Sequence, residues 1–87
     1  MQIAKEGSEK MINGTTKISL RAARTNADMT QVEAAERLSD FFGTTISRQR
    51  VMYYEKNPQK TPPAWGIAFA NIYHIPLEGI SFTHATT

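Results

Sequence analysis

The sequence feature that most constrains the fold is the pair Thr30 and Glu33, at the front of the stretch "TQVEAAERL". A threonine followed three residues later by a glutamate forms a capping box, in which each side chain satisfies a free backbone amide at the start of a helix. Behind this pair, Val32, Ala35 and Leu38 recur at the spacing of one helix face. The sequence therefore predicts an amphipathic helix whose inward stripe consists of these apolar residues.

The neighbouring segments extend the helical pattern in both directions. An earlier helix is predicted from about Lys17 to Thr25, with Leu20 and Ala23 facing inward, and it ends in the turn-forming stretch "TNAD". The capped helix is predicted to continue through two phenylalanines until Gly43 ends it in the left-handed conformation.

Three more helices are predicted toward the C-terminus. One starts at Ser47, a good N-cap, and ends by Asn57, with Val51 and Tyr54 as its buried edge. The next starts at "TPPAW", where a proline suits the first helical position, and a short last helix covers 77–82. The candidate first residues of the fourth helix are Pro62 and Pro63, and its apolar residues are Trp65, Phe69, Ile72 and Tyr73, of which Trp65 is expected in the core.

These patterns predict an all-α fold, a compact bundle of four to five helices, because no segment shows the two-residue alternation of a strand. The chain has 87 residues, enough for one domain with a small core, and 40% of them are hydrophobic. Zero cysteines exclude disulfides and thiolate metal sites. No apolar run resembles a signal or a membrane span, so a cytoplasmic protein is expected. The expected organisation is a flexible N-terminal arm at 1–15, a domain at 16–83 and a tail at 84–87.

Positive charge is concentrated on the third predicted helix and the loop after it. The formal net charge of the chain is only +2, which is too small to indicate a nucleic-acid partner by itself. Within residues 46–60, however, Glu55 is the only carboxylate among several cations. Those cations are Arg48, Arg50, Lys56 and Lys60. By contrast, the only formal charge in residues 61–87 is that of Glu78.

The outward face of the third helix carries groups that can read DNA bases. If Val51 and Tyr54 are buried, the side chains on the opposite side face solvent. Arginine can pair with guanine and glutamine with adenine, while methyl-bearing or aromatic side chains can touch the thymine methyl group. The candidate base contacts in a major groove are Arg48, Gln49, Met52 and Tyr53. Taken alone, a short helix of this composition is more often only solvated.

Phosphate contacts are expected around the same helix. Ser47 and Arg50 lie at its N-terminus, where unpaired backbone amides and the helix dipole favour an anion. Lys56 and Lys60 flank the loop that follows it. Exposed lysines beside asparagine and proline are also commonplace without any ligand, so both interpretations of these lysines stay open.

Three stretches together resemble the Cro-type, lambda-repressor-like (XRE family) helix-turn-helix domains. They are "LRAARTNADMTQVEAAERL" at 20–38, "ISRQRVMYYEKN" at 46–57 and "AFANIYHIPLEGI" at 68–80. The positions that match the family pattern are Leu20, Arg24, Thr30, Gln31 and Glu55. The resemblance implies a lambda-repressor-like bundle in which Arg24 pairs with Glu55, Gln31 binds a phosphate, and the helix at about 47–57 enters the major groove.

One departure from the family concerns the connection between the second and third helices. The stretch "SDFFGTTI" separates Leu38 from Ser47, which adds about six residues to the usual short turn. A longer loop costs little free energy, so the fold can accommodate it, although the angle at which the third helix meets DNA can change. Phe41 and Phe42 either cover the core, as aromatic residues at helical spacing usually do, or form a partner-binding patch.

The sequence thus predicts a sequence-specific DNA-binding regulator of transcription, a repressor of phage or mobile-element type that acts as a homodimer through the charge-poor segment 72–82. The alternative is a protein-interaction module, such as an antitoxin or anti-repressor, that uses Phe41, Phe42 or the same segment; an antitoxin that also represses its own operon stays open. No enzyme, cofactor or metal site is expected, because His74 and His84 lack metal-ligand or catalytic partners at suitable spacing.

Overall fold

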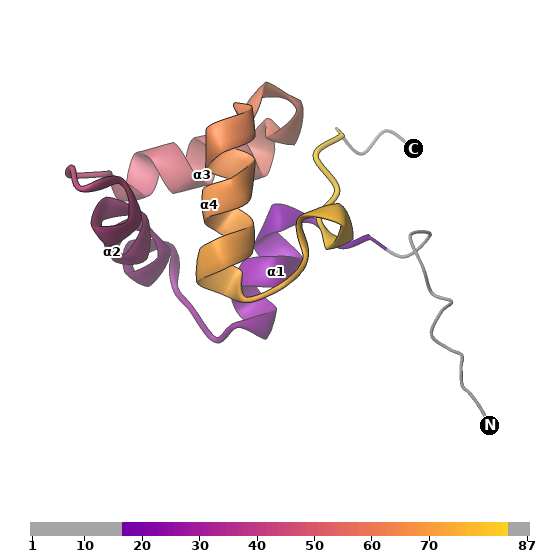
Figure 1. Cartoon of the computed structure of the whole chain (residues 1–87), viewed down its shortest axis with the longest axis horizontal. Helices are drawn as coiled ribbons and strands as arrows, with labels where there is room; N and C mark the ends of the chain where they lie inside the picture. Colours follow the sequence, from indigo (N-terminus) through magenta and orange to yellow (C-terminus); the bar gives the residue numbers. More distant parts are fainter. Residues whose placement is uncertain (1–16, 84–87) are drawn as a thin grey trace.

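Four α-helices and two single-turn 3-10 helices follow one another in the computed structural model, which describes residues 17–83. The α-helices are α1 (Leu20–Asn26), α2 (Gln31–Phe42), α3 (Arg48–Lys56) and α4 (Pro63–Tyr73), and the 3-10 turns are η3 (Pro58–Lys60) and η4 (Leu77–Gly79). α4 packs against both α1 and α2, and α3 packs against α2 (Figure 1). The predicted all-α bundle is confirmed; the predicted arm at 1–15 and tail at 84–87 lie outside the described residues.

The helix starts follow the predicted capping chemistry. The Thr30 hydroxyl accepts the amide of Glu33 at 3.0 Å, and the Glu33 carboxylate accepts the amide of Thr30 at 2.8 Å, which completes the capping box of α2. Ser47 caps α3 by accepting the amide of Arg50. Pro63 occupies the first position of α4, so the second of the two predicted prolines is the first helical residue. None of the helices within 17–83 has the length and apolar character needed to cross a membrane.

The core contains the predicted apolar residues, with one exception on α2. Fully buried side chains from α1, α2, α3 and α4 meet at its centre. The largest of them are Leu20, Leu38, Val51 and Phe69. The prediction that Val32 faces inward is wrong, because this side chain is 50% exposed, and Ala34 is buried instead. Successive residues turn by about 100°, so Ala34 and Leu38 share one face with Ala35 at its edge, and Val32 lies beyond that edge.

The first and last predicted helices are both shortened by pairing between the two ends of the domain. α1 begins at Leu20 rather than Lys17, and the helix predicted at 77–82 is only the turn η4. The backbone of Ile18 donates to Gly79 at 3.0 Å and accepts from Ser81 at 2.8 Å, which forms a bridge to Ile80. The six-residue helix predicted at 77–82 would have little stability of its own. The pairing with Ile18 and the burial of Ile80 therefore determine an extended conformation for residues 80–82.

Half of the eight residues that separate Leu38 from Ser47 are additional helix. α2 continues to Phe42, and Gly43 ends it with φ 71°, so only residues 43–47 lie between the two helices. The Ser39 hydroxyl accepts the amide of Ile46 at 2.8 Å and donates to the carbonyl of Ala35, which fixes the connection to α2.

The two phenylalanines at the end of α2 have different environments. Phe42 is half-buried, and its ring centroid lies 4.9 Å from that of Trp65 in α4. Phe41 is 43% exposed and contacts Phe42 edge to face. The expectation that aromatics here cover the core therefore holds for Phe42 and is wrong for Phe41.

Gly43→Ala is expected to lower the free energy of unfolding by about 1 kcal/mol, because a β-carbon is unfavourable in the left-handed region. No described atom lies within 4 Å of the position that the β-carbon would take, so the cost is conformational and not steric crowding. Gly43→Asn is the matched control and should lose much less, since asparagine tolerates this conformation. Urea denaturation measures both changes, and equal losses would contradict the conformational explanation.

Candidate nucleic-acid interface

α3 has one buried side and one side open to solvent. Val51 and Tyr54 pack into the core, while Gln49 and Tyr53 on the opposite side are exposed and Met52 is half-buried. Seen around the helix axis at about 100° per residue, Gln49 and Tyr53 lie in the middle of the open side. The base-reading face that the sequence predicts is therefore available to a ligand, with Met52 at its partly covered edge.

A buried ion pair fixes the orientation of α3 relative to α1. The Arg24 guanidinium donates to both carboxylate oxygens of Glu55, at 2.6 and 3.2 Å, and to the carbonyl of Met29 at 3.0 Å. The two side chains are only 10% and 6% exposed. The hydrogen bonds that Arg24 donates to Glu55, together with the negative charge of Glu55, raise the pKa of Arg24 against the opposing effect of burial. The ion pair that the family resemblance implied is thus present.

A tyrosine of α4 lies in the surroundings of this ion pair. The Tyr73 hydroxyl is buried and has no hydrogen-bond partner among the described residues. Burial raises its pKa, and the negative charge of Glu55 raises it further.

Gln31 connects the ion pair to the first arginine of α3. Its amide nitrogen donates to Glu55 at 3.0 Å, and its amide oxygen accepts from the Arg48 guanidinium at 3.1 Å. One of the two N–H groups of the Gln31 amide is left over for a further acceptor, since the nitrogen has two donors. The predicted phosphate contact of Gln31 is compatible with this geometry and stays a prediction.

Arg50 lies on the other flank of α3, beside α4. Its guanidinium carbon is 4.5 Å from the ring centroid of Trp65 and 5.8 Å from that of Tyr54, within cation–π range. The guanidinium makes no hydrogen bond or ion pair to any residue of 17–83. α3 is therefore flanked by Arg48, which contacts α2, and Arg50, which contacts α4.

The remaining candidates for phosphate contact are placed around the two ends of α3. The Ser47 hydroxyl already accepts the amide of Arg50 as a helix cap. Lys56 at the last turn of α3 and Lys60 at the end of η3 are both exposed. Since Arg24 neutralises Glu55, the exposed charges of α3 and η3 are all positive.

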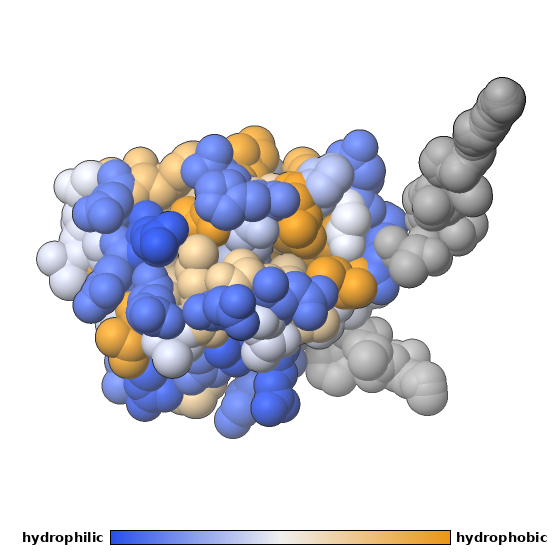
Figure 2. All heavy atoms as spheres, turned by 90° about the horizontal axis from the view of Figure 1, so that it is seen from below, coloured by the Kyte–Doolittle hydropathy of each residue, from blue (hydrophilic) through white to orange (hydrophobic). Residues whose placement is uncertain are grey.

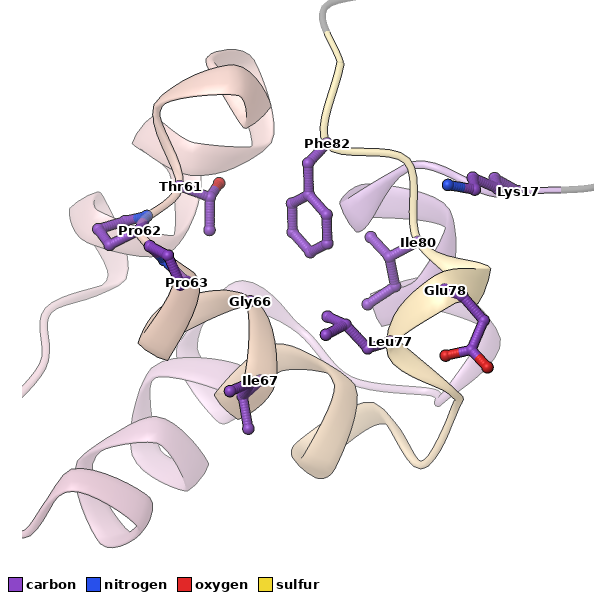
Figure 3. Close-up of a pocket in the computed structure, with 10 residues that line it drawn as sticks. All are labelled: Lys17, Thr61, Pro62, Pro63, Gly66, Ile67, Leu77, Glu78, Ile80 and Phe82. Atoms are coloured by element: carbon purple, nitrogen blue, oxygen red, sulfur yellow. The ribbon is translucent and has the colours of Figure 1, made fainter. Parts of the chain in front are cut away.

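A groove lies away from the reading face, between the start of α4 and the C-terminal segment. Its volume is about 480 Å³. Leu77, Ile80 and Phe82 point from the C-terminal segment toward the first turns of α4, with Lys17 and Glu78 at the rim (Figure 3). Around the start of α4 it is lined by the N-cap residue Pro62 and by Pro63, Gly66 and Ile67 of the helix. Figure 2 shows the domain from below the view of Figure 1. Apolar side chains lie at the surface in the middle of this side, with many polar residues around them.

Several of these contacts have no signal in the sequence pattern. Ser39 and the stacking of Arg50 on Trp65 were missed, because no local spacing rule connects residues of different helices. Gln31 was recognised only through the family resemblance, and its two protein partners could not be foreseen.

The histidines and the comparisons with known proteins add no other candidate site. His74 is exposed at the C-cap of α4 with φ 59°, and His84 lies outside the described residues. Among residues 17–83, no three His, Cys, Asp or Glu side chains lie close enough to hold a metal ion. No protein-family model, curated protein sequence or solved structure matches the chain. The resemblance to the lambda-repressor-like family therefore stays a prediction.

Arg24→Ala is expected to lower the free energy of unfolding by about 3 kcal/mol, because it leaves the Glu55 carboxylate buried without its partner. Arg21→Ala, an exposed arginine of the same helix, is the matched control and should change stability by no more than about 0.5 kcal/mol. Thermal and urea unfolding followed by circular dichroism measure both. Similar small effects of the two substitutions would mean that the ion pair is hydrated in solution.

Proposed function

We propose that this protein is a sequence-specific DNA-binding regulator of transcription that reads the major groove with α3. It acts in the cytoplasm as a repressor of phage or mobile-element type, by occupying a promoter. The observation that carries the proposal is the open face of α3, where Gln49 and Tyr53 are exposed between Arg48 and Arg50. A helix anchored this firmly on its inner side, with hydrogen-bonding and cationic groups on its outer side, suits a groove lined by base edges and phosphates.

The dimensions of α3 limit how many bases one copy reads. Nine residues of α-helix span about 13 Å, which corresponds to about four base pairs of B-DNA. Gln49 and Arg48 provide the directional hydrogen bonds, to adenine and guanine respectively, and Tyr53 and Met52 provide apolar contact with thymine methyl groups. Met52 contributes least, because it is half-buried in the domain.

Lys56, Lys60 and Arg50 contact the phosphate backbone, together with Gln31 and the capped N-terminus of α3 near Ser47. Contacts of this kind carry no sequence information but supply much of the affinity by releasing counterions. The positive charge around α3 supports the proposal. Glu55 is the only carboxylate in residues 46–60, and its ion pair with Arg24 neutralises its charge.

Two copies act together, because one short reading helix distinguishes too few bases. A two-fold pair of copies reads half-sites about 34 Å apart. The groove beside α4 supports a contact between copies, since Ile67 and Leu77 at its edges are 54% and 43% exposed. Ile72, Tyr73 and Ile80 are buried within the monomer, so the contact expected at 72–82 narrows to the residues near Leu77 and Phe82.

Gln49→Ala is expected to remove the preference at one base-pair position, at about 1 to 3 kcal/mol, because it deletes a base contact. Lys60→Ala, the control, should weaken binding to all sequences alike and reduce the salt dependence by about one counterion. Selection from a random duplex library, followed by affinity measurement on the selected site and its single-base variants, separates the two effects. Identical behaviour of the two variants would overturn the assignment of α3 as the reading helix.

Leu77→Asp is expected to convert the dimer into a monomer and to weaken DNA binding, because it places a charge in an apolar contact between copies. Val32→Asp introduces the same charge at a comparably exposed apolar position of α2, outside the groove, and should leave the dimer intact. Sedimentation equilibrium gives the association constants. A dimer that survives Leu77→Asp, or that is lost in Val32→Asp, would place the contact elsewhere.

A protein-interaction module, such as an antitoxin or anti-repressor, is the second candidate. The observation that favours it is Phe41, which is 43% exposed beside a hollow lined by Ile72 and His74. Salt titration distinguishes the two functions. DNA binding falls steeply with ionic strength, whereas apolar association does not.

A further inference from the structure

The stacking of Arg50 on Trp65 suggests a role for a residue that does not itself reach the outer face of α3. Trp65 is only 8% exposed, and its ring lies among aromatic neighbours of three helices. Its ring centroid is 4.9 Å from that of Phe42, 5.1 Å from that of Tyr54 and 5.9 Å from that of Phe69. Packing on several sides fixes the plane of the indole, so the face beneath Arg50 is a rigid support.

A stacked arginine keeps its hydrogen-bonding capacity. The five N–H groups of a guanidinium lie in its plane, so contact of one flat face with an indole leaves them free to donate. Arg50 is exposed, and within residues 17–83 these donors have no partner. The arrangement differs from that of Arg48, whose guanidinium already donates to Gln31.

We propose that Trp65 is a positioning residue for phosphate contact: its indole holds the guanidinium of Arg50 on the α4 flank of α3, with the N–H edge directed at the DNA backbone. An arginine that is free in solution loses rotamer freedom when it binds a phosphate, and prior ordering removes part of that cost. The inference rests on the proposed DNA binding. It adds that the affinity of α3 for DNA depends on a tryptophan of the neighbouring helix.

A double-mutant cycle on the full chain tests this role. The variants are Trp65→Leu, which removes the aromatic face, Arg50→Ala, and the two combined, with Trp65→Phe as the conservative variant. The probe is a fluorescently labelled mixed-sequence DNA duplex at low ionic strength, because phosphate contact needs no specific site. Affinities are measured below the unfolding temperature of every variant, so that folded protein is compared with folded protein.

Trp65→Leu is expected to reduce affinity by about two- to fivefold when Arg50 is present and to have no effect in the Arg50→Ala background. The salt dependence of binding should fall by up to about one counterion under the same conditions. Trp65→Phe should retain part of the affinity. The matched control is Ile72→Val, which alters a buried residue of the same helix outside the aromatic neighbours of Trp65 and should act equally in both backgrounds.

Two outcomes overturn the inference, and they are distinguishable. If Trp65→Leu weakens binding equally with and without Arg50, Trp65 acts only on the fold, and the proposed function stands. If the unaltered chain binds no duplex, the proposed function fails and the inference fails with it. Should Trp65→Leu not fold, Arg50→Lys replaces it, because lysine keeps the charge but not the planar stacking group; unchanged affinity of this variant also contradicts the inference.

Discussion

The ion pair between Arg24 and Glu55 connects α3 to most of the elements that surround it. Arg24 belongs to α1, Glu55 to α3, and the same guanidinium holds the carbonyl of Met29 in the turn before α2. Gln31 adds the first residue of α2 by donating to Glu55. A buried ion pair contributes little net stability, because desolvation offsets the attraction between the charges, but losing one partner is costly. The interaction therefore acts mainly on orientation: it determines which side of α3 faces the core and which side faces solvent.

This orientation places the two arginines of α3 on opposite flanks, and a different neighbouring helix constrains each of them. Arg48 donates to Gln31 of α2, while Arg50 stacks on Trp65 of α4. Gln49 lies between them without a comparable constraint and can adapt to a base. The two constraints have different consequences for hydrogen bonding. Arg48 uses one of its N–H donors on Gln31, whereas the contact of Arg50 with the Trp65 ring leaves all of its N–H donors free. The proposed base reading and the proposed phosphate contact thus have different structural support on the same short helix.

The parts of the fold that could be predicted are those specified by nearby residues. The capping box at Thr30, the proline at the start of α4 and the glycine after α2 act within one turn, and the sequence pattern identified them correctly. Val32 was misplaced because a spacing of three residues drifts around the helix, so two faces fit the same pattern equally well. The extended C-terminal segment depends on backbone pairing with Ile18, far away in the sequence, which no local propensity reveals. For the site, exposure of α3 followed from Val51 and Tyr54, whereas the contacts of Gln31 and Arg50 depend on the packing of separate helices.

The residues by which the stretch after Leu38 exceeds the spacing that the family resemblance implies contribute to the candidate site. They extend α2 by Phe41 and Phe42, and Phe42 packs on the indole that supports Arg50. The connection after them is short and fixed by Ser39, so α3 is not free to move on a flexible loop. A chain with a tighter turn at this point would lack this support for Trp65 from the α2 side. The same residues that separate this sequence from the usual helix-turn-helix spacing therefore complete the aromatic cluster on which the α4 flank of the reading helix depends.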